Sequence, residues 1–483
     1  MSILNDKNKI VTNFNPSGDL YIGDGFHIED NEKSKLYKIF TQKGNRLNHT
    51  FIFGSTGVGK TRLLENMIEQ NIKNGENVVI IDPKGDTDLL SKVIYLAHLN
   101  NRENDLMFLS PIYPEQSIKI NPLKHYYMPD EIIGHIMACI QCDDPFFYDS
   151  SLETTTLIVH SLLLIRDLNN SKEPLTFSEI SKYTSRAGIN DLYTNFFQSE
   201  ELRNNIIDKL LEKDQNLGLN LGNKRDIYKN KVNHLTTLLL KVINAPTGYF
   251  EKVSNTLNVA LTKMTSGNIG ALIGAETDNK FITKLENNEG VIFFVQTGSM
   301  LAKITSSAIA RVTISMIQTL VGRLNGSNKR FAKRLNVYID EMAEAVFTGI
   351  ETLYAQARST DVAIVGLTQS LADIIAVLGQ DSARKLFDNS ATKIIMKMND
   401  VTSAEHMAKF GGTRKMNSLV KNANGGLMTK EQDEDVIKVT DLLRLDKREF
   451  YYFGFEGQFK GITAPVTSSP LKIKFPEITI RLD

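Results

Sequence analysis

Eight consecutive residues could hold a phosphate group. The segment Gly54-Ser55-Thr56-Gly57-Val58-Gly59-Lys60-Thr61 fills every fixed position of the pattern GxxxxGK[ST]. It follows the apolar Phe51–Phe53 and precedes an amphipathic stretch, which is the strand–loop–helix context that this pattern requires. In such a loop, glycines let backbone N–H groups turn toward phosphate oxygens, Lys60 would neutralise β- and γ-phosphate charge, and the Thr61 hydroxyl would ligate Mg²⁺. The sequence therefore predicts a site for a nucleoside triphosphate with Mg²⁺, and a chance glycine turn is the alternative.

Two acids end another apolar segment. Leu335–Ile339 is typical of a buried strand, and Asp340 and Glu341 follow it directly. Buried acids are costly unless they meet a cation or water. Asp340 would hold Mg²⁺ through its shell, and Glu341 would orient or deprotonate the attacking water. The alternative is a strand that ends in a solvated acidic turn.

Two further polar loops follow apolar strands. Gln369 comes after Ala363–Leu367, where its amide could reach a γ-phosphate; the alternative is a helix-capping cluster with Thr368 and Ser370. The loop Asp82–Asp86 also follows an apolar run. In a doubly wound sheet the carboxyl ends of strands face the ligand crevice, so this loop is expected near the nucleotide. A plain tight turn explains it equally well.

The remaining candidates favour structural roles. Cys139 and Cys142 form a CxxC motif and share a helix face with His135. Three local ligands without a second CxxC favour buried, inert cysteines over a metal or redox site. The basic runs Lys224–Lys231 and Asn328–Arg334 are expected in loops, where solvated faces are the default and DNA contact is the alternative.

The composition is that of an ordinary globular protein. With 483 residues, 41% hydrophobic residues and two Cys, we expect two or three domains and no disulfide scaffold. The balance of 56 Lys plus Arg against 56 Asp plus Glu excludes a uniformly basic nucleic-acid coat but allows a local basic channel. The N-terminal residues are too polar for a secretory signal, and no apolar run reaches the roughly 20 residues that cross a bilayer. We therefore expect a soluble cytosolic chain.

The elements that position these residues fall into three zones after a leading segment, residues 1–47. Residues 48–128 and 289–483 alternate apolar strands with amphipathic helices, as in parallel βαβ units, whereas residues 129–288 are predicted to be an all-alpha insertion. The two outer zones are expected to build one sheet, so the fold class is α/β.

The expected strands are His49–Phe53, Asn77–Asp82, Leu106–Leu109, Gly290–Val295, Leu335–Ile339, Ala363–Leu367, Lys393–Lys397 and a late edge strand, Glu449–Phe455. The expected helices include Lys60–Asn74, Asp86–Leu96, Asp130–Cys142, Leu152–Arg166, Glu200–Lys213, Val232–Asn244, Val253–Met264, Ala302–Leu324 and Ala343–Ala357, and Leu217–Lys231 is expected to be a surface loop.

The order of the motifs resembles a known family. The segments GSTGVGKT and IIDPKGD, a helical insertion, YIDE and GLTQS follow one another along the chain. Asp144–Phe147 and Phe387–Ile394 add to the likeness, which extends from about Gly23 to Phe455. With these motifs in this order, the chain resembles type IV secretion coupling proteins, the TraD/TraG-like ATPases of conjugation systems.

The resemblance implies a RecA-like P-loop NTPase domain with an inserted all-alpha domain, assembled as a homo-hexamer that binds ATP and Mg²⁺ between subunits. It also implies an arginine finger at Arg358, which would join Lys60, Glu341 and Gln369 as catalytic residues. From the residues alone, Arg358 is a basic side chain at a helix end. Members of the family usually carry an N-terminal membrane anchor. This chain begins almost directly at the nucleotide-binding domain, so we expect membrane contact only through partner subunits, at the cytoplasmic face of the bacterial inner membrane.

The resemblance favours an ATP-hydrolysing coupling protein that recruits DNA or nucleoprotein and translocates it into a type IV secretion channel. One alternative is a nucleotide-controlled receptor platform for protein effectors of such a system. Another is a HerA/FtsK-like DNA translocase, which shares the catalytic residues but is disfavoured by the helical insertion.

Overall fold

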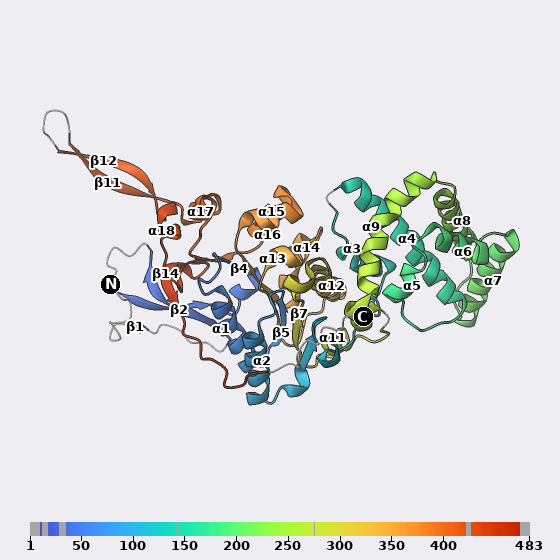
Figure 1. Ribbon diagram of the computed structural model, residues 1–483, viewed down its shortest axis with the longest axis horizontal. Helices are drawn as coiled ribbons and strands as arrows, with labels where there is room; N and C mark the ends of the chain where they lie inside the picture. The colour runs from blue at the N-terminus through green and yellow to red at the C-terminus, as the bar shows by residue number, and fades with distance from the viewer. Residues whose placement is uncertain are drawn as a thin grey trace. The chain divides into compact units, whose positions relative to one another are not determined.

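The protein folds into two compact units in a computed structural model that describes residues 10–11, 18–28, 35–142, 144–274, 276–421 and 427–473. The α/β unit takes its described residues from 1–107, 287–296 and 324–483. The helical unit comprises residues 108–286 and 297–323. Figure 1 shows the strands in the first unit and a cluster of helices in the second.

In the described part of the chain, twelve strands form one sheet in the order β1-β3-β2-β14-β13-β10-β4-β9-β8-β5-β7-β6. These strands are β1 (Ile10–Val11), β2 (Leu20–His27), β3 (Leu36–Thr41), β4 (Thr50–Phe53), β5 (Asn77–Asp82), β6 (Leu106–Leu109), β7 (Ile292–Gln296), β8 (Leu335–Ile339), β9 (Val362–Thr368), β10 (Thr392–Met396), β13 (Glu449–Gly454) and β14 (Gly457–Thr463). Strands from both outer zones of the sequence alternate in this order, so the prediction of a single sheet is confirmed.

The centre of the sheet is parallel and buried. β10, β4, β9, β8, β5 and β7 pair in parallel, and every residue of these six strands is buried. Such strands need cover on both faces, which explains their continuous apolar runs. Because these strands are parallel, their carboxyl ends form one edge of the sheet. The loops that follow β4, β5, β8 and β9 all begin at this edge.

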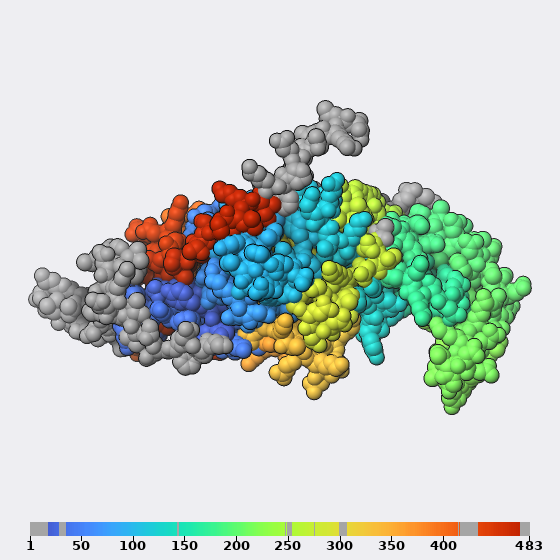
Figure 2. Space-filling view, turned by 90° about the horizontal axis from the view of Figure 1, so that it is seen from below, coloured from blue at the N-terminus to red at the C-terminus, as the bar shows by residue number. Residues whose placement is uncertain are grey.

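Helices connect these strands within the α/β unit. They are α1 (Lys60–Lys73), α2 (Thr87–Leu99), α13 (Met342–Ala345), α14 (Ile350–Gln356), α15 (Leu371–Leu378), α16 (Gln380–Asp388), α17 (Val401–Ala408) and α18 (Val439–Leu443). Phe387 of α16 packs on β4, with ring centroids 4.9 Å from Phe51 and 5.6 Å from Phe53. At the described end of the chain, the carbonyl of Thr467 accepts a bond from Lys92 Nζ of α2 at 3.1 Å, and Figure 2 shows these C-terminal residues on the surface beside α2.

Two features differ from the sequence-based expectation for the α/β unit. Glu449–Phe455 was expected at an edge, but β13 lies inside the sheet between β10 and β14, which fits its buried aromatic residues on both faces. Ala343–Ala357 was expected as one helix, but α13 ends before the extended Val346, and α14 begins only after Gly349, which has a φ of 97°. A separate two-stranded ribbon, β11 (Thr413–Lys421) with β12 (Leu427–Asp435), projects beyond α17 and α18 in Figure 1.

The helical unit is built from helices of very different lengths. They are α3 (Pro129–Ala138), α4 (Pro145–Leu168), α5 (Phe177–Ser181), α6 (Arg186–Phe196), α7 (Glu200–Asn216), α8 (Lys224–Ile243), α9 (Thr247–Thr265), α10 (Gly267–Ile269), α11 (Lys280–Glu286) and most of α12 (Ser299–Gly326). The predicted loop Leu217–Lys231 is wrong in its second half, because α8 begins at Lys224. Lys224 Nζ and the Tyr228 hydroxyl both donate to Asp214 Oδ2 of α7, at 2.8 Å and 2.5 Å, and these bonds hold the basic run in the helix. Among the described residues, no helix is both long and apolar enough to span a bilayer.

Candidate nucleotide site

The phosphate-binding pattern forms a loop between β4 and α1. Gly57 and Gly59 have φ values of 80° and 113°, which side chains rarely adopt, so these glycines allow the loop to curl before α1 begins at Lys60. The backbone N–H of Gly54 donates to the carbonyl of Thr368 at 3.3 Å, and that of Ser55 donates to Lys397 at 2.8 Å. The neighbouring strands β9 and β10 therefore hold the start of the loop in place.

Lys60 points back into this loop. Its Nζ donates to the carbonyl oxygen of Gly54 and, at 3.0 Å, to that of Ser55. The residue is only 5% exposed, and burial, helped by repulsion from Lys84, lowers the pKa of Lys60 to about 8. A buried ammonium held inside a curl of backbone groups is suited to binding phosphate oxygens.

The predicted metal ligands meet beside the loop. The Thr61 hydroxyl lies 3.3 Å from Asp340 Oδ1 and 3.5 Å from Oδ2, although the two residues are far apart in the sequence. Burial raises the pKa of Asp340, and nearby cations oppose this shift. A hydroxyl and a carboxylate at a helix start and a strand end are hard oxygen ligands, so this pair fits Mg²⁺.

Gln369 joins the phosphate loop to the second acid. Its Oε1 accepts a bond from the Thr56 hydroxyl at 2.9 Å, and its Nε2 donates to Glu341 Oε2 at 3.1 Å. Burial raises the pKa of Glu341. The second carboxylate oxygen of Glu341, its Oε1, is buried and has no hydrogen-bond partner within the described ranges. An oriented carboxylate with one free lone-pair face can accept a proton or a hydrogen bond from water.

Lys84 is a site residue that the sequence-based list of site residues did not include. It lies in the loop after β5, and its Nζ forms an ion pair with Asp340 Oδ2 at 2.9 Å. Asp82 accepts hydrogen bonds from the backbone N–H groups of Lys84, Gly85 and Asp86, and burial raises its pKa to about 6. The only sequence signal for Lys84 was its position at the carboxyl end of an apolar strand. That signal places a loop at the sheet edge but does not identify the partner of its lysine.

Solved structures of a conjugative coupling protein have a similar fold. The bacterial coupling protein TrwB in its unbound form superposes with a TM-score of 0.63 at 15% identity, over 91% of this chain and 89% of that chain. TrwB in complex with ADP and Mg²⁺ gives a TM-score of 0.61 at 15% identity, over 89% of this chain and 88% of that chain. These likenesses confirm the predicted α/β fold, a RecA-like P-loop domain.

Sequence comparisons agree with the fold. Residues 42–247 match the family described as the central domain of the helicase HerA. Over 89 residues the chain is 29% identical to the type 4 coupling protein DotL of Legionella pneumophila, a match that spans 18% of this chain and 11% of DotL. Residues 334–447 match the family described as the TraM recognition site of TraD and TraG. The chain is therefore similar to type IV coupling proteins of the TraD/TraG type.

Arg358 is not brought to the phosphate loop of its own chain. It lies exposed in the 3₁₀ turn Ala357–Thr360, before β9, whereas Gln369 follows the same strand. A strand of seven residues spans roughly 20 Å, so Arg358 and Gln369 lie at opposite edges of the sheet. Arg358 therefore lies far from the phosphate loop of its own chain.

The CxxC motif has one buried cysteine, Cys139, and one half-buried cysteine, Cys142. α3 ends at Ala138, so Cys139 caps the helix and Cys142 lies beyond it, which corrects the expectation of a shared helix face. His135 Nδ1 bonds to the hydroxyl of Ser315 at 2.9 Å, and the Cys139 thiol donates to the carbonyl of His135 at 3.3 Å. Burial lowers the pKa of His135 to about 3 and raises that of Cys139 to about 12. A buried thiol of this kind is a poor metal ligand and a poor nucleophile.

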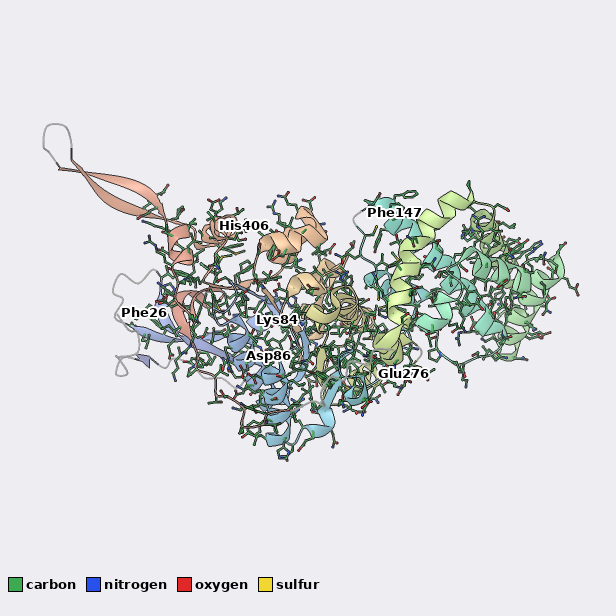
Figure 3. All side chains as sticks on the ribbon, viewed as in Figure 1. Phe26, Lys84, Asp86, Phe147, Glu276 and His406 are labelled. Atoms are coloured by element: carbon green, nitrogen blue, oxygen red, sulfur yellow. The ribbon has the colours of Figure 1, made fainter. Side chains whose placement is uncertain are left out.

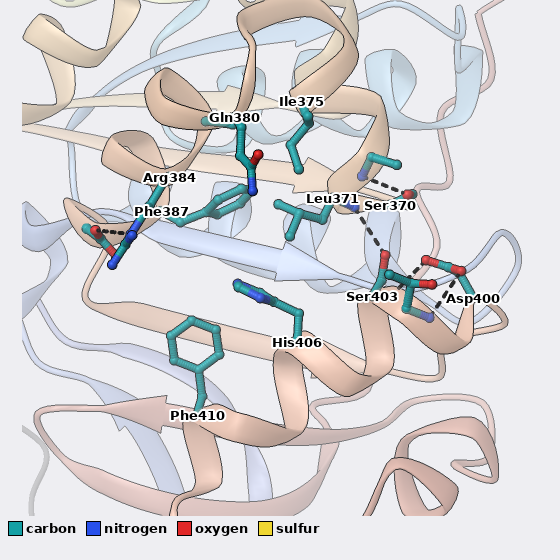
Figure 4. A pocket seen from close by; sticks show the side chains of 14 residues that line it. Ser370, Leu371, Ile375, Gln380, Arg384, Phe387, Asp400, Ser403, His406 and Phe410 are labelled. Carbon is teal, nitrogen blue, oxygen red and sulfur yellow. Dashed lines mark hydrogen bonds and ion pairs between the residues drawn. The ribbon is translucent and has the colours of Figure 1, made fainter.

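A pocket lies next to the glutamine segment, within residues 334–447. It has a volume of about 750 Å³ and is lined mainly by apolar groups of α15, α16 and α17. Figure 4 shows Leu371, Ile375 and Phe387 on one side, and His406 and Phe410 on the other. The backbone N–H of Leu371 donates to the Ser403 hydroxyl at 3.4 Å, so the two walls are joined near Gln369.

Proposed function

We propose that the α/β unit binds ATP with Mg²⁺ and hydrolyses it. The observation that carries this proposal is the bridge from the Thr56 hydroxyl through Gln369 to Glu341, beside the contact between Thr61 and Asp340. It joins the phosphate loop, the metal ligands and a buried carboxylate at one edge of the sheet. All of these groups belong to one unit, so the assignment does not depend on how the two units are arranged.

Each residue has a distinct task in this proposal. Lys60 and the loop N–H groups bind the β- and γ-phosphates, and Thr61 with Asp340 holds Mg²⁺, which neutralises developing phosphate charge. Glu341 orients the attacking water and accepts its proton, while Gln369 holds that carboxylate and contacts the loop. These tasks need no side chain from outside the α/β unit.

Arg358 is proposed to act on a neighbouring copy in a homo-hexamer. Its exposure at the opposite edge of the sheet supports this role, because it is excluded from its own site but open to another subunit. Replacing an arginine finger typically lowers hydrolysis by about 10³-fold or more. We expect Arg358→Ala to do so in the assembled form while leaving nucleotide affinity nearly unchanged. Mixing it with Lys60→Ala should restore some activity at the mixed boundaries, and no recovery would argue against action in trans.

The work driven by hydrolysis is proposed to be recruitment and translocation of DNA or nucleoprotein into a type IV secretion channel, at the cytoplasmic face of the inner membrane and through partner subunits. The match to coupling proteins supports this proposal. The test is ATP turnover with and without single-stranded DNA, with Lys60→Ala as the control. We expect stimulation that declines as salt rises. An assembled protein without any turnover would overturn the motor proposal.

A second candidate function is a receptor for protein partners, and the apolar pocket at Leu371 and Ile375 favours it. The pocket lies within the region that matches the TraM recognition family, and an apolar pocket with a few polar groups suits a protein side chain. Titration calorimetry with purified TraM tests this candidate. We expect Ile375→Asp to weaken binding about tenfold, whereas the same change at the exposed Val401 should not. Equal binding by both variants would remove the pocket from the proposal.

A further inference from the structure

Lys84 occupies a cation position on Asp340. Its ammonium lies 2.9 Å from Asp340 Oδ2 and 3.4 Å from the carbonyl oxygen of the same residue. The carboxylate is buried, with 1% of its side chain exposed, whereas the Lys84 side chain is 42% exposed. The buried acid is therefore neutralised by a cation that can withdraw toward solvent.

The loop that carries Lys84 has a defined shape. Three consecutive backbone N–H groups, those of Lys84, Gly85 and Asp86, donate to the Asp82 carboxylate at 2.9, 3.2 and 2.6 Å. Gly85 has a φ of 82°, which supplies the turn. Figure 3 labels Lys84 and Asp86 near each other in the α/β unit. The loop therefore directs a long, flexible side chain toward the end of β8.

Lys84 and a divalent cation would use the same carboxylate. The proposed metal ligands are Thr61 and Asp340, and the Thr61 hydroxyl lies within 3.5 Å of the Asp340 oxygen that Lys84 contacts. An ammonium and Mg²⁺ on one buried carboxylate repel each other strongly, because little water screens them. Metal binding and the ion pair of Lys84 therefore exclude each other.

A buried amide lies beside the same loop. Gln296 ends β7 next to Asp82 in the sheet register and is 1% exposed. Both polar atoms of its amide are buried without a hydrogen-bond partner in the part of the chain that the structure describes. A Cβ added at Gly85 would lie 3.9 Å from Gln296 Nε2. Because buried amides are normally paired, this unpaired amide is available as a partner for the backbone of the neighbouring loop.

We propose that Lys84 is a positioning residue that competes with Mg²⁺ for Asp340, so that binding of the metal–nucleotide releases the Lys84 loop toward Gln296. This inference rests on the proposed function, because it takes Thr61 and Asp340 as the metal ligands. It adds a cation from the chain itself that sets how much Mg²⁺ the site requires. It also links the state of the site to a loop at the sheet edge.

The main test measures the Mg²⁺ requirement for nucleotide binding. Titration calorimetry with a non-hydrolysable ATP analogue, repeated across a series of Mg²⁺ concentrations, gives the half-saturating Mg²⁺ concentration. We expect Lys84→Met to lower that concentration about three- to tenfold and Lys84→Arg to keep it near the wild-type value. Lys73→Met is the matched control, because Lys73 is 54% exposed in an ion pair at the far end of α1. An unchanged value in Lys84→Met would overturn the inference, and a higher value would make Lys84 a ligand of the phosphates instead.

A second measurement follows the loop directly. Hydrogen exchange of the Lys84, Gly85 and Asp86 amides should change when the Mg²⁺–nucleotide is added, and Gln296→Leu should reduce that change. The same change in both proteins would remove Gln296 from the inference. A wild-type protein that binds no nucleotide would overturn the proposed function and this inference together. Normal binding with no effect of Lys84→Met would overturn the inference alone.

Discussion

The two units bury polar side chains in different ways. In the α/β unit, the buried charged group Asp340 follows the carboxyl end of β8, where it meets the Thr61 hydroxyl and the Lys84 ammonium. In the helical unit, the neutral His135 pairs with Ser315, and the Asn279 side chain donates to the carbonyl of Asn121 at 2.9 Å. Buried charge is costly and is retained where chemistry needs it, whereas neutral paired groups only have to satisfy hydrogen bonds. The helical unit also buries charged side chains such as Asp214 and Arg311, so the comparison concerns these particular groups: His135 and Asn279 only satisfy hydrogen bonds, whereas Asp340 is a buried charge beside the phosphate loop.

The largest effect should come from the acid at the end of β8. We expect Glu341→Gln to lower ATP hydrolysis by about 10²–10⁴-fold, because the amide cannot accept a proton from water. Affinity for a non-hydrolysable analogue should stay within a few-fold, since the phosphate loop is unchanged. Phosphate release and calorimetry measure the two effects. Glu153→Gln, at an exposed acid of the helical unit, is the control, and a comparable loss there would break the comparison.

Acid should destabilise both units through buried histidines. Burial lowers the pKa of His49 to about 4 and that of His135 to about 3, from 6.5. Because the unfolded chain takes up protons first, stability is fully present above about pH 6.5 and is lost as the pH falls toward these values. We expect each histidine to cost roughly 2–3 kcal/mol between pH 7 and pH 4.5.

Calorimetric melting across this pH range checks the histidine prediction. His49→Asn should flatten the pH dependence of the α/β unit, and His135→Asn that of the helical unit. Each variant also loses packing, so the informative quantity is the slope against pH and not the stability at pH 7. Slopes equal to the wild type would show that other groups control acid unfolding.

A core truncation should separate stability from the site. Leu239 of α8 is completely buried, and Leu239→Ala is expected to cost about 2–5 kcal/mol of unfolding free energy in the helical unit. Nucleotide affinity of the α/β unit should not change at temperatures where both units are folded. Denaturant melts with calorimetry at the same temperature test this prediction. Leu219→Ala, at a leucine that is 48% exposed, should cost far less.

The smallest effect is expected at the surface of the helical unit. Arg225 pairs with Asp208 at 3.1 Å, and both side chains are more than half exposed. Water and salt screen such a pair, so Arg225→Ala should change the unfolding free energy by about 0.5 kcal/mol or less. If the same variant strongly weakened DNA binding at low salt, the basic start of α8 would be a nucleic-acid contact and not only a solvated face.

Much of the fold could be predicted from local pattern. β5, β6 and β8 have the predicted bounds, because a continuous apolar run closed by polar residues defines a buried strand. β2 was missed because Gly23 and Gly25 interrupt its apolar alternation. Their missing side chains let β14 approach, since a Cβ on Gly23 would lie 2.1 Å from the carbonyl oxygen of Ile462. That reason is visible only once the two strands are paired.

In the candidate site, too, local pattern predicted some residues and missed others. The pattern Gly54–Thr61 and the acids Asp340 and Glu341 carried a prediction of nucleotide and Mg²⁺ binding, because their chemistry is fixed by residue type and short spacing. Lys84 was missed because its partner, Asp340, is 256 residues away. No local pattern encodes a contact at that separation.

The sequence by itself determined which reactive groups this protein carries, in the phosphate loop, the acidic pair and the glutamine. The tertiary structure decided which of those groups meet. Strand order placed β4, β9, β8 and β5 side by side, so that Thr56 reaches Gln369 and Lys84 reaches Asp340, while Arg358 stays at the opposite edge. The physical reason is that residue type and spacing act locally, whereas a parallel sheet brings together strand ends that lie far apart along the chain.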